Sequence, residues 1–301
     1  MAAGLLFDRA LLRQRRARAA RMGPATFLMD HVAVELGERL GAITRRFAIG
    51  ADIGSPTGAV RRTLHASARV DTLIGVGACD PCGRDAGPAV QADEEALPFK
   101  DAALDLVVSA LSLQFVNDLP GTLLQIRRAL KPDGLFLAAL LGERSLTELR
   151  QAFAAAETEI EGGLSPRIAP FADVRTLGGL LQRADFALPV VDVETLTVRY
   201  DSAFALMQDL RRMGATNVLV ERRRTPLRRA TLMRVAEIYA ARFADPDQRV
   251  RATFDVVWLS GWAPHPSQQR PLRPGSAQAR LAEVLGATEV SLGEGAPGGR
   301  R

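Results

Sequence analysis

The sequence is poor in cysteine, histidine, lysine and aromatic side chains. Its 301 residues include two cysteines, three histidines and two lysines, and only 5% are Phe, Trp or Tyr. Two cysteines cannot build a disulfide framework, and no apolar targeting segment precedes the first charges, so we expect a reducing, cytoplasmic compartment. No apolar run approaches the ~18 residues that cross a bilayer, so no transmembrane segment is expected.

The same scarcity limits metal and hydrolytic chemistry. Cys79 and Cys82 form a CxxC pair, which suggests a redox or metal site, but a structural zinc ion needs four ligands and no second pair follows. The histidines, at positions 31, 65 and 265, show no ligand spacing. A Gly-x-Ser-x-Gly element is absent as well. We therefore expect no metal site and interpret the cysteines as small turn residues.

The charge balance is mildly basic. Lys and Arg number 39 against 34 Asp and Glu, a net charge of +5. The arginines concentrate in residues 9–21 and 221–229, without the interleaved aromatic side chains that stack on nucleic-acid bases. With 47% hydrophobic and 24% charged residues, the composition is that of an ordinary globular protein. No nucleic-acid partner is expected.

The N-terminal segment permits two interpretations. Residues 1–23 are rich in arginine, nearly free of acid and end at Gly23 and Pro24, which is typical of an organellar presequence. The alternative is an amphipathic helix whose Leu5, Leu11 and Leu12 pack on the body of the protein.

From about residue 45, short apolar runs alternate with helical spans, which is typical of a doubly wound parallel sheet. The predicted strands are 47–53, 72–78, 104–110 and 135–141, and the helices between them are 59–67 and 119–130. Further helices are expected near 145–159, 171–184, 202–213 and 229–243, with an extended pair near 188–200. Residues 252–262 alternate as a late strand, and if that strand returns to the sheet the helices before it form a lid.

Polar residues and glycines follow successive strands. Asp52, Gly54 and Gly58 lie around the end of the first strand, and Asp80 follows the second. Asp93 and Glu94 precede the strand that ends at Ser109. Ligands bind at the carboxyl ends of such strands, so these residues define one candidate crevice, in which an acid such as Asp80 pairs with ribose hydroxyls. Taken singly, each also fits an ordinary turn residue.

Together these motifs, with the Leu97-Pro98-Phe99 turn and residues 130–134 (LKPDG), resemble the class I S-adenosylmethionine-dependent methyltransferases. The resemblance implies S-adenosylmethionine as cofactor. Asp93 or Glu94 would contact its adenine side, Asp80 its ribose, and Gly54 with Gly58 its methionine portion, with Asp52 and Ser109 in the same site. Gln114, just past the third long strand, would face the acceptor.

A closer resemblance, to the family of complex I assembly factor 5, covers nearly the whole chain. It is carried by residues 7–9 (FDR), 92–95 (ADEE), 111–120 (LSLQFVNDLP), 156–159 (AETE), 161–166 (EGGLSP) and 261–277, which include His265 and Arg270. The family is implicated in hydroxylating an arginine of a respiratory complex I subunit, which makes such a subunit an implied partner. Residues 7–9 match the start of the mature family members and favour the N-terminal helix. The sequence shows no two-histidine, one-carboxylate cluster for iron, so we assign no hydroxylation mechanism and no catalytic residue.

A third resemblance is to the malonyl-carrier methyltransferase of biotin synthesis. Tyr200 and residues 201–217 are similar to the lid of that enzyme and imply an acyl carrier protein as alternative partner. We place Gln114, Tyr200, His265 and Arg270 on the substrate side. The cofactor loop departs from the usual Gly-x-Gly-x-Gly, because Pro56 replaces the middle glycine and lacks an N–H group. The loop is therefore expected to be remodelled but still occupied.

The sequence thus predicts an α/β protein with a Rossmann-like, mostly parallel methyltransferase sheet of seven strands. We expect an N-terminal helical cap at 1–44, a cofactor-binding core at 45–200 and a helical lid at 201–250. The final strand spans 251–263 and rejoins the core, and a tail at 264–301 is expected to be disordered from about 291. The predicted function is that of an S-adenosylmethionine-dependent enzyme of complex I assembly. The alternatives are a non-methylating assembly factor or arginine hydroxylase, and a malonyl-carrier methyltransferase.

Overall fold

A computed structural model describes residues 4–77, 87–269 and 286. Residues through His265 form one compact unit, which is the unit considered below. The CxxC pair, Asp80, Arg270 and the expected disorder from about 291 lie outside the described residues. No helix of the described part is long and apolar enough to cross a membrane.

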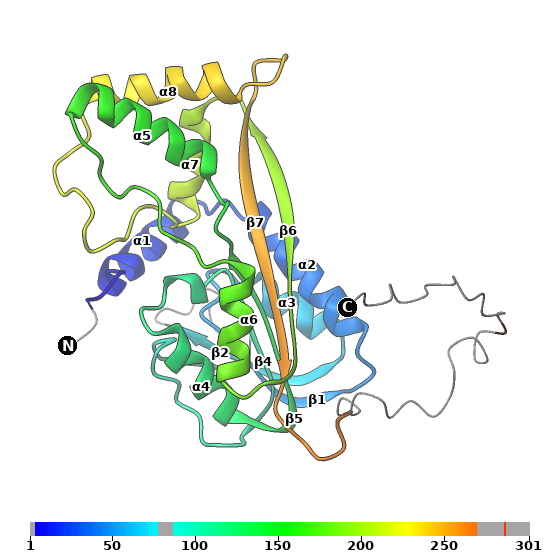
Figure 1. Ribbon diagram of the computed structural model, residues 1–301. Helices are drawn as coiled ribbons and strands as arrows, with labels where there is room; N and C mark the ends of the chain where they lie inside the picture. The colour runs from blue at the N-terminus through cyan, green and yellow to red at the C-terminus, as the bar shows by residue number, and fades with distance from the viewer. Residues whose placement is uncertain (1–3, 78–86, 270–285, 287–301) are drawn as a thin grey trace, which may run out of the picture. The chain divides into compact units, whose positions relative to one another are not determined.

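One sheet forms the centre of the unit (Figure 1), with the strand order β3-β2-β1-β4-β5-β7-β6. The strands are β1 (Phe47–Ile53), β2 (Val70–Gly77), β3 (Ala89–Gln91), β4 (Leu104–Ala110), β5 (Leu130–Leu141), β6 (Ala187–Tyr200) and β7 (Val250–Trp262). The first five pair in parallel, whereas β7 runs antiparallel between β5 and β6. The predicted seven-stranded, mostly parallel sheet is confirmed, and the late strand does rejoin it.

Helices cover both faces of this sheet. They are α1 (Arg9–Arg21), α2 (Phe27–Gly41), α3 (Ala59–Ala66), α4 (Leu119–Ala129), α5 (Thr147–Glu161), α6 (Val174–Arg183), α7 (Ala203–Arg212) and α8 (Arg229–Phe243). Leu106 and Val108 of β4 pack in the core with α2 and α3, whereas Val107 between them packs with α4 and α6. Because both faces are covered, every residue of β4 is buried, which explains its unbroken apolar run.

Three local expectations were wrong. The extended pair near 188–200 is a single strand, β6, whose residues 190–200 pair continuously with β7. β5 begins at Leu130, because residues 131–134 are accommodated by an irregularity in its pairing with β4. The three-residue strand β3 was missed, since so short a segment carries no periodicity.

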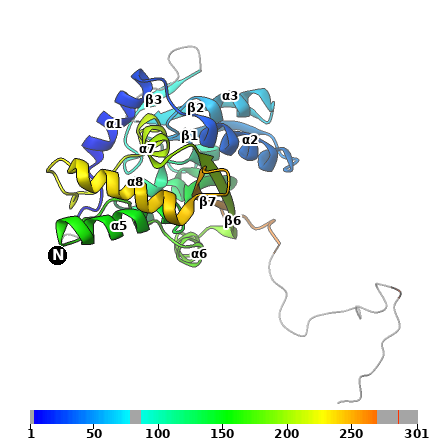
Figure 2. The ribbon, with the colours of Figure 1, turned by 90° about the horizontal axis from the view of Figure 1, so that it is seen from above.

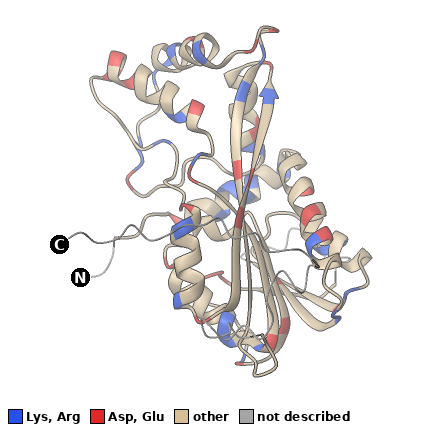
Figure 3. Ribbon diagram, turned by 45° about the vertical axis from the view of Figure 1, so that its right-hand side comes forward, with Lys and Arg blue, Asp and Glu red and all other residues tan. Residues whose placement is uncertain are grey.

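The long strands β6 and β7 extend beyond the parallel strands and reach the lid helices (Figure 1). In the lid, α8 packs along α5, and Figure 2 shows the two helices side by side over the sheet. Basic and acidic segments are interspersed along these helices and strands (Figure 3). Helix α5 thus packs with α8 of the predicted lid, although it lies more than 40 residues before the helices of that lid in sequence.

Helix α1 is docked by Phe7, which lies just before it. The Phe7 ring is buried and meets Phe115 edge-on at 5.7 Å between ring centroids. Asp8 caps the helix by accepting a hydrogen bond from the Leu11 N–H at 2.9 Å. Leu12 is buried as expected, but Leu5 is 65% exposed and does not pack on the body. Docking thus depends on Phe7 in place of Leu5.

We predict that Phe7→Ala releases α1 without unfolding the sheet. Removing a buried phenylalanine ring costs about 3 kcal/mol, and this ring belongs to a small cluster apart from the main core. Hydrogen exchange of residues 9–21 should become faster, while that of β4 and β5 stays unchanged. The control is Leu5→Ala, which removes an exposed side chain and should alter neither; equal effects of the two changes would contradict this account of docking.

Candidate functional site

The loop after β1 requires glycine at one position. Gly54 has φ +71°, and its N–H donates to the Val76 carbonyl at 2.6 Å. A Cβ atom there would overlap the Ser112 hydroxyl and the Glu94 carboxylate. Gly54 therefore allows the loop after β1 to touch both the acidic loop, which is residues 92–95, and the segment after β4.

Asp52 and Ser109 lie beneath this loop. Asp52 is 3% exposed and accepts a hydrogen bond from the Ser55 hydroxyl, and burial raises its pKa to about 7. Ser109 is fully buried and donates to the Ile53 carbonyl at 2.7 Å. Both side chains use their polar atoms to hold the β1 loop against β4, so in this structure they support the loop from below.

Asp93 and Glu94 are bound by arginines from α1. Arg9 donates to both carboxylates, Arg13 donates to Asp93 at 2.9 Å, and Arg16 donates to Glu94 at 3.3 Å. Burial raises the pKa of Asp93, but the Glu95 N–H and the guanidiniums outweigh it and hold the pKa below the usual value. We call these five residues the ion cluster. It joins α1 to the acidic loop.

The sequence carried a signal for the ion cluster that composition alone does not reveal. Positions 9, 13 and 16 are spaced four and three residues apart, so they share one face of a helix. Their partners are about 80 residues away, so no local pattern in the sequence pairs these arginines with Asp93 and Glu94.

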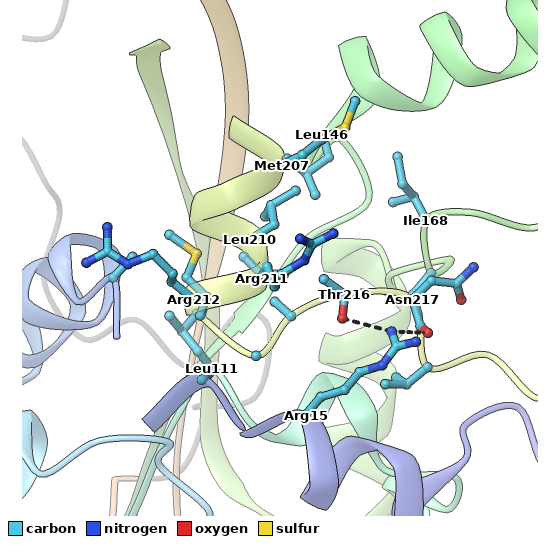
Figure 4. Close-up of a pocket in the computed structure, with 18 of the residues that line it drawn as sticks. Arg15, Leu111, Leu146, Ile168, Met207, Leu210, Arg211, Arg212, Thr216 and Asn217 are labelled. Atoms are coloured by element: carbon cyan, nitrogen blue, oxygen red, sulfur yellow. Dashed lines mark hydrogen bonds between the residues drawn. The ribbon is translucent and has the colours of Figure 1, made fainter. Parts of the chain in front are cut away.

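A cavity of about 720 Å³ opens above the carboxyl ends of β1 and β4. Its lower wall contains Pro56 and Thr57 from the first loop and Leu111, Gln114 and Phe115 from the segment after β4. The upper wall comes from α5, α7 and residues 213–219, and Figure 4 shows Leu146, Ile168, Met207 and Leu210 around it. A cavity of this size and apolar character is typical of a small-molecule site.

Two leucines in the cavity wall have left-handed backbone conformations. Leu111 has φ +50° and Leu146 has φ +57°, which is uncommon for side chains other than Gly and Asn. Neighbouring strands hold both residues, since the Leu111 N–H donates to Ala139 at 2.8 Å and the Leu146 N–H donates to Thr253 at 2.7 Å. Such conformations cluster at binding sites, and no sequence signal marks a leucine for one.

The residues predicted on the substrate side do not lie together in the structure. Gln114 lines the cavity, and its side-chain oxygen is buried without a hydrogen-bond partner among the described residues. Tyr200 is buried in the hydrophobic core beside the lid, and burial raises its pKa. His265 follows β7, whose last residue pairs with Leu135 near the start of β5, so it lies at the opposite edge of the sheet from the cavity. Within residues 4–77 and 87–269, no three metal-ligating side chains come together.

Comparison with known proteins identifies this architecture. Residues 51–138 match the methyltransferase domain family. A methyltransferase of Bacillus halodurans, 13% identical, covers 77% of this chain and 98% of its own with a TM-score of 0.53. The YcgJ protein of Bacillus subtilis, 15% identical, covers 78% of this chain and 99% of its own with a TM-score of 0.51. The chain is a methyltransferase-fold protein.

Similar proteins of known name indicate the family to which this chain belongs. The human protein named arginine-hydroxylase NDUFAF5, mitochondrial, is 39% identical over 93% of this chain and 83% of its own length. The chain belongs to the NDUFAF5 family. It is also similar to the malonyl-[acyl-carrier protein] O-methyltransferase of Gallionella capsiferriformans, at 33% identity over 88% of this chain and 94% of that protein. The three resemblances noted in the sequence are confirmed.

The buried Asp52 gives the fold a defined pH dependence. Its folded-state pKa of about 7 exceeds the unfolded value of ~4, so the folded state holds one more proton between these limits. The contribution of this proton to the free energy of unfolding is fully present below about pH 4. It is lost as pH rises to about 7, by roughly 1 kcal/mol per pH unit.

We predict that Asp52→Asn removes this loss, because the amide stays neutral and can still accept from Ser55. Urea unfolding between about pH 4 and 7 should show the variant gaining stability over the parent as pH rises. The exposed Asp101, changed to Asn, serves as control and should follow the parent. Parallel curves for the parent and Asp52→Asn would contradict the assignment of a proton to Asp52.

Proposed function

We propose that this chain binds S-adenosylmethionine above β1 and β4 and modifies a protein-bound or carrier-bound substrate, as part of respiratory complex I assembly. One observation carries the proposal: the loops that follow β1 and β4 line one cavity at the point where the strand order reverses. The match of residues 51–138 to a methyltransferase domain supports the cofactor. The NDUFAF5 relatives support the biological role, and they are named mitochondrial. The proposed cytoplasmic compartment is supported by the scarcity of cysteine in the sequence.

Several residues fit the methionine end of the cofactor. Pro56 and Thr57 of the β1 loop line the cavity, whereas Gly54 and Gly58 on either side of them are buried and are not among its lining residues. Arg16 lies 3.4 Å from the Gly54 carbonyl and also lines the cavity. A guanidinium there suits the carboxylate of the methionine portion. Pro56 lies in the cavity wall, and a cavity of about 720 Å³ remains beside it. In this proposal Asp52 and Ser109 act by fixing the loop.

The residues predicted to contact the adenosine part of the cofactor fit it less directly. Asp93 or Glu94 would accept from the adenine amino group, but α1 arginines already bind both carboxylates. A carboxylate has lone pairs for more than one donor, so the cofactor and α1 would share them. Asp80, proposed for the ribose, lies outside the described residues.

The bound cofactor supplies an electrophilic methyl group on a sulfonium. The chain contributes alignment and a water-poor cavity, which is what an in-line displacement needs. Gln114 can orient an acceptor, because its side-chain oxygen is unpartnered within the described structure. Among the proposed substrate-side residues in the described part, only Gln114 lines the cavity.

The proposal predicts that S-adenosylmethionine titrates the intact chain with a calorimetric signal and that Arg16→Gln weakens binding about 10-fold to 100-fold. That range corresponds to a charge-assisted hydrogen bond of about 1.5–3 kcal/mol. Arg18 is exposed on the same helix and has no ion pair among the described residues, so Arg18→Gln is the matched control and should bind normally. A flat titration of the parent chain would remove the cofactor from the proposal.

The relatives and the matched domain point to different groups transferred to the substrate. The relatives' name favours hydroxylation of arginine, whereas the matched domain favours methylation. We predict that a complex I subunit co-expressed with the chain gains about 14 Da if a methyl group is added, and about 16 Da if an oxygen atom is added. Intact-mass spectrometry distinguishes the two.

The same co-expression without this chain is the control and should leave the mass unchanged. A subunit with an unaltered mass in both cases would contradict an enzymatic role on that partner. Biotin auxotrophy on deletion of the gene would instead support the malonyl-carrier alternative, which the similarity to O-methyltransferases suggests.

A further inference from the structure

The described wall of the cavity contains no group that could neutralise a cationic substrate side chain. Arg15, Arg16, Arg167, Arg211 and Arg212 line it, and no Asp or Glu is among its described lining residues. A guanidinium that leaves water for a mostly apolar cavity needs a carboxylate partner, because an unpaired buried charge is costly. The proposed function includes an arginine of a complex I subunit as a substrate. The counter-charge of that arginine must then come from a carboxylate behind the wall.

Three carboxylates pair with arginines of this wall, namely Glu94, Glu157 and Asp209. Two arginines of α1 already bind Glu94, and Asp209 is partly exposed on α7. Glu157 differs from both, because its side chain is 1% exposed and one cation, Arg167, binds it within the described residues. Glu157 is therefore a buried carboxylate that the movement of a single arginine would release.

Glu157 and Phe153 together hold the Arg167 guanidinium. The Arg167 Nε donates to Glu157 Oε1 at 2.7 Å, and Nη2 donates to the same oxygen. The Arg167 Cζ atom lies 5.6 Å from the centroid of the Phe153 ring. Phe153 and Glu157 are four residues apart on α5, so they share one face of that helix. A carboxylate beside an aromatic ring is a combination that binds a guanidinium.

Arg167 belongs to an irregular segment, residues 162–173, which joins α5 to α6 and forms neither helix nor strand. No backbone–backbone hydrogen bond within the described structure begins or ends in residues 163–172. The segment starts with two exposed glycines, Gly162 with φ +70° and Gly163, and a Cβ atom at either would meet no other atom within 4 Å. A segment with so few backbone hydrogen bonds opens at a lower free energy than the helices it joins.

We propose that Glu157 and Phe153 form the guanidinium site for the substrate arginine, and that Arg167 occupies this site until the substrate displaces it. The inference rests on the proposed function, because it assigns a site and a mode of regulation to the arginine substrate. Arg167 and Phe153 line the cavity, so an incoming side chain meets the site at the wall. Leu149 and Met207 offer an apolar wall to the methylene stem of the substrate side chain.

The test uses the intact chain and two tripeptide probes, acetyl-Ala-Arg-Ala-amide and its citrulline counterpart, which has nearly the same shape but no charge. Binding of the arginine probe should make hydrogen exchange of residues 162–173 faster, and the citrulline probe should leave it unchanged, because only a guanidinium competes with Arg167 for the carboxylate. Exchange in the buried strand β4 should not change. Unchanged exchange of residues 162–173 with the arginine probe bound, or no binding of that probe, would overturn the proposal.

Variants test the competition itself. An internal occupant lowers the apparent affinity by the fraction of chains in which the site is free, so Arg167→Ala should bind the arginine probe about 10-fold more tightly than the parent chain. Adding Glu157→Gln to Arg167→Ala should abolish that binding, because a neutral amide does not balance a buried guanidinium. Arg175→Ala, an exposed position on α6 just after the segment, is the matched control and should bind as the parent does.

Arg167→Ala leaves a buried carboxylate without its cation, which destabilises the fold, so melting curves of the single and double variants accompany the titrations. The exchange experiment on the parent chain does not depend on either variant. Equal affinity of the parent and a folded Arg167→Ala chain for the arginine probe would overturn the proposal. Binding of that probe that survives in the double variant would overturn it as well.

Failure here is distinguishable from failure of the proposed function. A chain that binds S-adenosylmethionine but whose residues 162–173 do not respond to the arginine probe overturns the guanidinium site alone. A chain that responds to the arginine probe but does not bind S-adenosylmethionine overturns the cofactor and leaves the guanidinium site standing.

Discussion

The structure depends on one topological constraint: β1 and β4 are neighbours, but the helices that follow them cross to opposite faces of the sheet. Val60 and Leu64 of α3 pack on one face, and Leu123 and Ile126 of α4 pack on the other. The two connections must therefore diverge above the strands, and a crevice opens between them. Gly54 and Leu111 both have left-handed backbone conformations, and they lie in the two segments that border this crevice.

Closure of the crevice comes from distant parts of the chain. Helix α1 is held over the acidic loop by the ion cluster and by Phe7, and the lid approaches α1 through Gly214. A partly buried pair such as Arg9 with Glu94 adds little net stability, but removing either partner leaves an uncompensated charge. The cluster therefore sets the position of α1 more than it stabilises the fold.

The sheet could be predicted from the sequence because its signals are local. The buried β4 run, the glycines after β1 and the alternation of β7 each lie within about a dozen residues. The site was predictable only in part. Gln114, Pro56 and Thr57, which follow β4 and β1 in the sequence, line the cavity, and the binding roles predicted for the site residues stay predictions. The pairing of Arg9 with Glu94 and the hydrogen bond from Arg15 to Thr216 link positions more than 80 residues apart, and neither periodicity nor composition encodes such distances.

The central claim is that a nucleoside cofactor occupies the crevice between the loops that follow β1 and β4. Hydrogen exchange of the intact chain, measured with and without S-adenosylmethionine, tests it most directly. The account predicts slower exchange in residues 54–58 and 111–115 and no change at the opposite edge of the sheet, near Trp262. Unchanged exchange in both loops, or protection confined to the region around Trp262, would contradict it.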